Sequence, residues 1–191
     1  MRHFIYFSAT APTSGNFDLK DLMKAGRLDI AIHSFIQAVF LSNSVRDNVV
    51  FHFIFYGMPD PPKHIEIHSK EEVSISKKDV GNLLKKILYK GRDKKTEVLP
   101  GCFVEKKSFL KVVEELKEEN EIFILDKKGE DIRDIKIPEN CVFILGDHKG
   151  LPQKEMKRLK KVLTSVIIGP KIYFASQTVA IVNNELDRRG L

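Results

Sequence analysis

Hydrophobic residues in this chain gather in short runs that alternate with longer, mixed segments. The runs at 4–7, 49–55, 122–125 and 141–145 are rich in aromatic and β-branched residues, which is typical of buried strands. Residues 28–41 instead repeat apolar side chains every three or four positions, which predicts a helix with one wide apolar face. Strand patterns and helix patterns therefore occur in turn along the chain.

The remaining segments follow the same alternation. They are a half-exposed strand at 64–68, a turn at 99–103, helices at 80–89, 108–117 and 176–188, a basic helix at 153–161 and a strand at 163–168. Strands that alternate with helices favour parallel pairing, because the helix carries the chain back to the start of the next strand. The sequence thus predicts an α/β fold with a mostly parallel sheet covered by helices on both faces.

Length and composition narrow the picture. With 191 residues, of which 42% are hydrophobic, the chain can build one domain with a substantial core. The formal net charge of +6 is compatible with an acidic partner such as RNA, although a solvated basic surface also explains it.

The cysteines and the amino-terminal residues indicate in which cellular compartment the protein works. Cys102 and Cys141 form no CxxC pair and belong to no His/Cys cluster with metal-ligand spacing, so we expect free thiols and no metal. The apolar run at 4–7 is too short for a signal peptide, and no run approaches the roughly 18 to 20 apolar residues of a membrane span. We therefore expect a cytoplasmic protein with no membrane partner.

Candidate chemistry lies where three late strands end. The strands at 122–125, 141–145 and 163–168 are followed by Asp126, Gly146 and Gly169. A glycine there lets backbone groups approach a ligand without a Cβ in the way, and parallel sheets bind ligands at this edge. Such turns also occur in α/β domains that bind nothing. The GxGxxG and Walker patterns are absent, which argues against dinucleotide binding and nucleotide hydrolysis.

These three strand ends in order, together with the chain from 122 onward, resemble the SPOUT superfamily of RNA methyltransferases, and within it the archaeal tRNA pseudouridine-54 N1-methyltransferase family. The resemblance implies a C-terminal trefoil knot, bound S-adenosylmethionine and a homodimer. General topology rules would not predict the knot. It also implies one domain, 1–191, with an RNA-facing half at about 1–100 and a cofactor-binding half at about 120–191. The implied cofactor-binding residues are Leu125, Leu145, Gly146, Ile168, Gly169, Tyr173, Phe174, Ala175 and Thr178.

The amino-terminal half offers candidates for RNA binding and catalysis. Arg27 and Asp29 resemble the family's arginine and aspartate at the start of a helix, where the dipole favours anions, although a helix cap with a surface ion pair is an equal alternative. Arg46 follows the same helix and reaches either phosphate or the terminal carbonyls. Asp60 lies in a proline-bound loop. Which carboxylate, Asp29 or Asp60, accepts or orients the N1 proton stays open.

The resemblance implies methylation of N1 of pseudouridine-54 in the tRNA T-loop, with S-adenosylmethionine as the methyl donor and tRNA as the partner. One alternative is the related Nep1 branch, which modifies pseudouridine in rRNA. Another is an RNA-binding assembly factor that has kept the fold without catalysis. We expect His3, His52 and His68 to be packed or solvated, because they lie in or beside predicted strands.

Overall fold

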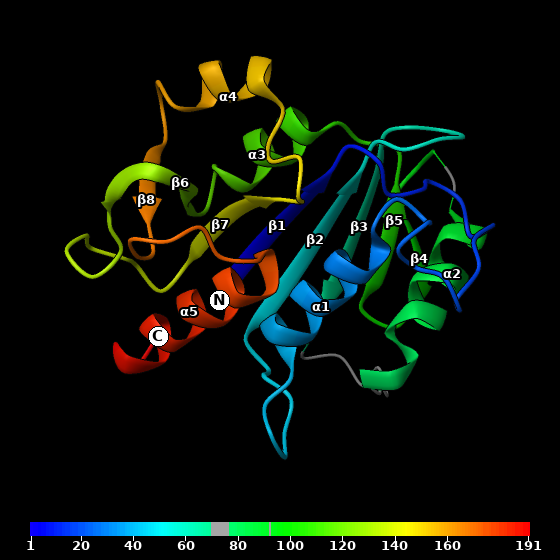
Figure 1. Ribbon diagram of the computed structural model, residues 1–191, viewed down its shortest axis with the longest axis horizontal. Helices are drawn as coiled ribbons and strands as arrows, with labels where there is room; N and C mark the ends of the chain where they lie inside the picture. The colour runs from blue at the N-terminus through cyan, green and yellow to red at the C-terminus, as the bar shows by residue number, and fades with distance from the viewer. Residues whose placement is uncertain (70–76, 92) are drawn as a thin grey trace.

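The computed structural model describes residues 1–69, 77–91 and 93–191, and the strands of this part form one sheet (Figure 1). The strand order across the sheet is β4-β5-β3-β2-β1-β7-β6-β8. The strands are β1 (Arg2–Ser8), β2 (Val49–Phe55), β3 (Lys63–His68), β4 (Thr96–Leu99), β5 (Cys102–Glu105), β6 (Glu121–Asp131), β7 (Cys141–Gly146) and β8 (Thr164–Ile167). The helices are α1 (Leu28–Val39), α2 (Val80–Lys90), α3 (Phe109–Leu116), α4 (Gln153–Leu159) and α5 (Ala175–Arg188), and a short 3-10 helix, Lys77–Asp79, precedes α2.

The sheet is mostly parallel, as the alternation of strands and helices predicts. β2, β1, β7, β6 and β8 pair in parallel, whereas β3, β5 and β4 continue the sheet by antiparallel pairing. The predicted turn at 99–103 is the tip of the β4–β5 hairpin, with Gly101 at a positive φ of 70°. The two hairpin strands escaped the sequence analysis because four residues each carry too little periodic signal.

Two buried clusters lie on the sheet. Phe4 and Tyr6 of β1 belong to one cluster, and Ile5 and Phe7 belong to the other, because successive side chains of a strand point to opposite faces. Helices α1, α2 and α5 contribute to the first cluster, and α3 and α4 contribute to the second. Figure 1 shows α1 and α5 side by side.

Strand β3 differs from the prediction of a half-exposed strand. Lys63, His64, Ile65 and Ile67 are all buried. The strand lies between β2 and β5, and the polar side chains on one of its faces are hydrogen-bonded to neighbouring strands. Alternation of polar and apolar residues therefore marks a buried apolar face and a polar face that is buried at His64 and partly exposed at Glu66 and His68.

The parallel strands place their carboxyl ends at one edge of the sheet, where β1, β7, β6 and β8 are neighbours. Helix α1 begins at this edge, directly after Gly26 and Arg27, which both have positive φ, 58° and 62°. A non-glycine residue in this region carries strain. Within the described part of the chain, no helix is both long and apolar enough to cross a membrane.

Candidate active site at the carboxyl edge of the sheet

A cavity of about 770 Å³ opens at the carboxyl ends of β7 and β8 and beside Leu125 of β6. Leu125 lies within its strand, because β6 continues past the predicted end at 125 to Asp131. The structure brings all nine residues of the implied cofactor set to its wall: Leu125, Leu145, Gly146, Ile168, Gly169, Tyr173, Phe174, Ala175 and Thr178. They come from the middle of β6, from the ends of β7 and β8, from the segment before α5 and from the first turn of α5. Ile30 of α1 completes the wall from the amino-terminal half.

The backbone near Gly146 folds back so closely that only glycine fits at this position. A Cβ built on Gly146 would lie 2.5 Å from the carbonyl carbon of Gly150 and 2.9 Å from its Cα atom. Both are backbone atoms of a tight turn that closes with an amide-to-carbonyl hydrogen bond from Gly150 to Asp147. The turn can therefore fold back under the cavity only if position 146 has no side chain.

Gly169 approaches Tyr173 in a similar way. Its φ is 156°, and a Cβ at this position would lie 2.9 Å from the Tyr173 hydroxyl oxygen. The segment from Gly169 to Phe174 thus packs against itself at the cavity wall. Ile172 and Phe174 line the cavity as well, and 91% and 77% of their surface is exposed. Apolar residues at such exposure are candidates for contact with a partner.

Asp147 fixes the end of β1 against the end of β7. Its carboxylate accepts a hydrogen bond of 2.6 Å from the Ser8 hydroxyl and one of 2.8 Å from the Lys149 amide. Its own amide donates to the Phe7 carbonyl at 3.0 Å. Asp147 is buried and lies on the cavity wall, as do the neighbouring His148 and Lys149.

Arg27 and Asp29 form a bidentate pair beside the cavity. The Arg27 Nε and Nη2 atoms donate to the two Asp29 oxygens, each at 2.9 Å. These bonds lower the pKa of the Asp29 carboxyl, so the group stays ionised at neutral pH. Asp29 directly precedes Ile30, a residue of the cavity wall.

Tyr6 lies near this pair and is fully buried on β1. Its hydroxyl has no hydrogen-bond partner among the described residues. Burial raises the pKa of this phenol, and the charges of Asp147 and Asp29 raise it further. The phenol is therefore neutral at physiological pH.

The structure does not bring Asp60 into the cavity. Asp60 lies in the loop after β2, where its carboxylate pairs with Lys63 at 3.1 Å and with Lys106. Hydrogen bonds from Lys106 and then Lys63 lower the pKa of Asp60. The loop ends at the same edge of the sheet as the cavity, but Asp60 does not line the cavity wall.

Arg46 lies at the opposite, amino-terminal edge of the sheet, just before β2. Its guanidinium donates to both oxygens of Asp187 on α5, at 2.7 and 2.6 Å, and only 11% of the side chain is exposed. Its backbone amide donates to the Val39 carbonyl at the end of α1. Arg27 and Arg46 are thus at opposite ends of α1, as the sequence predicts, whereas the pairing of Arg46 with Asp187 was not predicted.

A second hollow, of about 660 Å³, occupies the amino-terminal edge and is lined largely by charged and polar residues at 117–121. It offers few apolar walls, whereas a pocket for a small organic molecule is mostly apolar with a few fixed polar groups. The cavity at the carboxyl edge meets that description. Of its further lining residues, Asp147 could have been found from its place after Gly146, but Ile30 could not, because it lies far away in the sequence.

The overall fold is similar to the crystal structure of Archaeoglobus fulgidus Nep1 bound to S-adenosylhomocysteine, with a TM-score of 0.68 and 12% identity over 100% of this chain and 99% of that one. The chain is therefore an α/β protein with a fold similar to that of Nep1. The chain belongs to the family whose model is described as "Putative SAM-dependent RNA methyltransferase", which matches residues 1–191.

Two relatives show how close the sequence similarity is. A Pyrococcus abyssi protein named tRNA (pseudouridine(54)-N(1))-methyltransferase is 37% identical over 100% of both chains. A Vibrio parahaemolyticus protein named "Putative pseudouridine methyltransferase" is 34% identical over 99% of both. The similarity thus extends over the amino-terminal half as well as the cavity.

Proposed function

We propose that this protein transfers a methyl group from S-adenosylmethionine to N1 of pseudouridine-54 in the tRNA T-loop. The observation that carries the proposal is the cavity beside β6 and the ends of β7 and β8 in a chain of this family. The full-length similarity to proteins named for this reaction supports the substrate. The rRNA-directed alternative has only a likeness of fold behind it.

The cavity fits S-adenosylmethionine in size and in chemistry. Its volume of about 770 Å³ lies within the range of roughly 300 to 1,000 Å³ that small-molecule sites occupy. Leu125, Leu145 and Ile168 supply apolar surface for a flat base, and the turn at Gly146 exposes backbone groups for hydrogen bonds. When bound, the cofactor supplies an electrophilic methyl group on a sulfonium.

Asp29 is our candidate for the group that takes or orients the N1 proton of the acceptor base. Arg27 holds its carboxylate ionised and fixes its orientation at the start of α1. A carboxylate so placed can accept a proton as the nucleophile develops. Asp60 is the weaker candidate, because two lysines already engage it outside the cavity.

We propose Arg27 as a phosphate contact, because about a third of its side chain, 36%, is exposed beside the cavity. Arg46 could bind phosphate only after leaving Asp187, so RNA contact by Arg46 requires a rearrangement at the amino-terminal edge. Lys127, Lys149 and Lys171 on the cavity wall add positive charge toward an RNA backbone.

The architecture around the site extends the proposal. Helix cover on both faces is supported by the two buried clusters. After the edge strand β8 the chain returns to α5, which packs with α1, and we propose that this return threads a trefoil knot.

We propose a homodimer, supported by exposed Ile172 and Phe174. The working unit would be a single domain in the cytoplasm, with an RNA-facing half at 1–100 and a cofactor-binding half at 120–191.

The test is a methyl-transfer assay with labelled S-adenosylmethionine. Three RNAs are compared: a tRNA transcript with pseudouridine at position 54, the same transcript with uridine, and an rRNA fragment that contains pseudouridine. Methylation of the first RNA alone, located at N1 by mass spectrometry, is expected. Methylation that ignores pseudouridine, or that favours the rRNA fragment, would refute the substrate assignment.

A further inference from the structure

Four of the six histidines gather on one face of the sheet, away from the methyl-transfer cavity. His3 lies on β1, His52 on β2, and His64 and His68 on β3. His52 is directly opposite Glu66 in the β2–β3 register, so the two side chains share a face. This is the face of Ile5 and Ile54, which belong to the second buried cluster.

A continuous line of hydrogen bonds joins these imidazoles. His3 Nδ1 and His52 Nε2 are 3.0 Å apart, His52 Nδ1 and His64 Nε2 are 3.0 Å apart, and His64 Nδ1 lies 3.0 Å from the Glu105 Oε1 atom. Because an ionised carboxylate only accepts, His64 donates through Nδ1. The Nε2 lone pair of His64 therefore points toward His52.

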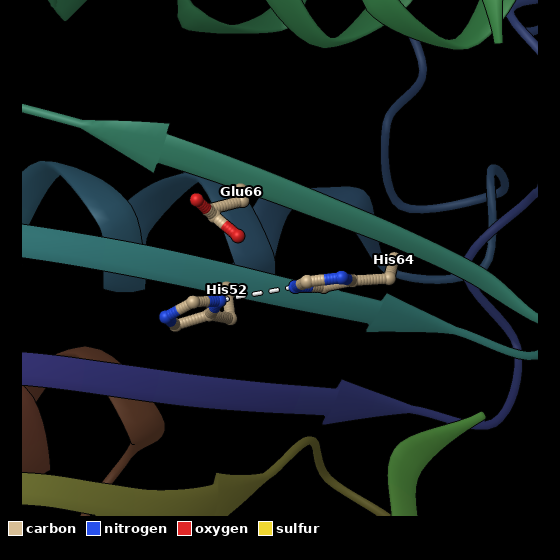
Figure 2. A group of neighbouring side chains, drawn as sticks. All are labelled: His52, His64 and Glu66. Atoms are coloured by element: carbon tan, nitrogen blue, oxygen red, sulfur yellow. Dashed lines mark hydrogen bonds between the residues drawn. The ribbon is translucent and has the colours of Figure 1, made fainter. Parts of the chain in front are cut away.

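Glu66 approaches the middle of this line from the side (Figure 2). One nitrogen of His52, one nitrogen of His64 and one carboxylate oxygen of Glu66 all lie within 4.8 Å of one another. The Glu66 carboxylate is held in place by His68 at 2.6 Å and by Lys95 at 3.0 Å. Two nitrogens and one oxygen thus converge on one point between β2 and β3.

We propose that His52, His64 and Glu66 form a binding site for a divalent transition-metal ion of the Zn²⁺ class. Two imidazoles and a carboxylate are a ligand set that Zn²⁺ and Co²⁺ accept, usually with a fourth ligand from solvent. Glu105 stands behind His64 as the carboxylate that accepts the other ring proton, an arrangement that orients metal-binding histidines. The sequence spacing does not reveal this set, because pairing of β2 with β3 assembles it.

The proton between His52 and His64 can be accommodated without a charge change. On metal binding, the proton of His52 moves from Nδ1 to Nε2 and is donated to His3 Nδ1, so the direction of that hydrogen bond reverses. The proton of His3 moves from Nδ1 to Nε2 at the same time, so both rings change tautomer and neither changes charge. The two ligand nitrogens, now 3.0 Å apart, would separate slightly, because the metal–nitrogen bonds are about 2.0–2.1 Å long and diverge from the ion. The ion would then join β2 to β3.

Metal titration of the full-length protein tests the site. Protein treated with a chelator is titrated with Zn²⁺ by calorimetry and with Co²⁺ by visible absorption. We expect one equivalent per chain, Co²⁺ bands of a site with nitrogen ligands, and a higher melting temperature with metal. Glu66→Gln and His64→Gln should each weaken binding about tenfold or more. His33→Gln, which changes an exposed histidine on α1, should bind like wild type.

Glu66→Gln keeps the size of the side chain and one oxygen, which can accept from either His68 or Lys95, so it tests the site even if His64→Gln fails to fold. Absence of binding in wild type would reduce the cluster to a hydrogen-bonded network and overturn the proposal. Binding that is unchanged in a folded Glu66→Gln protein, or that is lost in His33→Gln, would also overturn it.

Discussion

Arg46 and Asp187 join two distant parts of the chain by a bidentate ion pair, with hydrogen bonds of 2.7 and 2.6 Å. Arg2 donates to the same carboxylate at 3.0 Å and to the side-chain oxygen of Asn183 at 2.8 Å. Asp187 therefore links the start of β1, the segment before β2 and the last turns of α5. A residue expected to contact RNA instead holds the amino-terminal edge of the sheet together.

Replacing Asp187 with Asn should destabilise the protein by about 1–2 kcal/mol at neutral pH, because Arg2 is buried and loses a charged partner. Burial raises the pKa of Asp187, but the hydrogen bonds from Arg46 and Arg2 outweigh it and leave the pKa lowered. The ion pair therefore stabilises the protein above the unfolded pKa of about 3.9, and this stability is lost as the pH falls through the lower folded value. Urea unfolding of both proteins at pH 7 and pH 3 should show the difference narrowing at pH 3.

Asp134→Asn, at an exposed position, is the control for that experiment and should have little effect at either pH. An Asp187→Asn deficit of equal size at both pH values would show that the carboxylate charge is not what stabilises this edge.

Arg27→Gln and Arg46→Gln should behave differently. Loss of Arg27 should weaken tRNA binding and reduce the slope of log affinity against log salt by roughly one, because one phosphate contact disappears. Loss of Arg46 should lower the free energy of unfolding and leave the salt slope unchanged. Binding isotherms at several salt concentrations, with urea unfolding alongside, separate the two effects. A flattened salt slope in Arg46→Gln would indicate that Arg46 contacts an RNA phosphate.

Gly146→Ala should weaken binding of S-adenosylmethionine and destabilise the fold by about 1–3 kcal/mol, the scale of overpacking. The added methyl would lie 2.5 Å from backbone, which cannot yield as a flexible side chain can. Calorimetry with the methyl donor and thermal melting measure the two effects. In Gly91→Ala, the control, the nearest atom is a valine methyl at 3.3 Å, so both quantities should stay close to wild type. Unchanged affinity in a folded Gly146→Ala protein would place the cofactor elsewhere.

Asp29→Asn should slow methyl transfer at saturating tRNA and cofactor by about a hundredfold or more, the usual contribution of a positioned acid or base. Asp60→Asn should keep a rate near wild type, because Asp60 is paired with lysines outside the cavity. Single-turnover rates of both variants provide the measurement. A normal rate in Asp29→Asn together with a slow Asp60→Asn protein would show that Asp60, and not Asp29, takes or orients the N1 proton.

Both cysteines should be unreactive in the folded protein. Burial raises the pKa of Cys102 and that of Cys141 to about 11 each, so the thiolate is scarce at pH 8. A chromogenic disulfide reagent should label neither thiol before denaturant is added and both afterwards. Rapid labelling of the native protein would indicate that β5 or β7 opens readily.

Much of the fold follows from hydrophobic periodicity. The predicted strand at 49–55 coincides with β2, Val49–Phe55, and the predicted helix at 28–41 differs from α1 only at its end. Long periodic segments of this kind repeat one signal many times. The strands of the β4–β5 hairpin are too short for that, and the burial of His64 depends on partners that pairing brings from other strands.

The candidate site, like the fold, could be predicted from the sequence only in part. Resemblance placed Leu125, Gly146 and Gly169 in one cavity, although Leu125 lies within β6, Gly146 ends β7 and Gly169 follows β8. Asp60 and Arg46 were chosen for residue type and loop position, which say nothing about their ion-pair partners. Two of those partners, Lys106 and Asp187, lie 46 and 141 positions further along the chain. Only the tertiary structure reveals them.

The central place of β1 has a consequence for synthesis of the chain. β1 is among the first segments to leave the ribosome, yet one of its two neighbours, β7, begins at Cys141. At about 5–20 residues per second, β1 waits on the order of ten seconds with one edge unpaired. That edge carries Phe4, Ile5, Tyr6 and Phe7, a run that can attract other nascent strands. We therefore expect slower translation between β2 and β7 to lengthen this exposure and to increase the demand for chaperones.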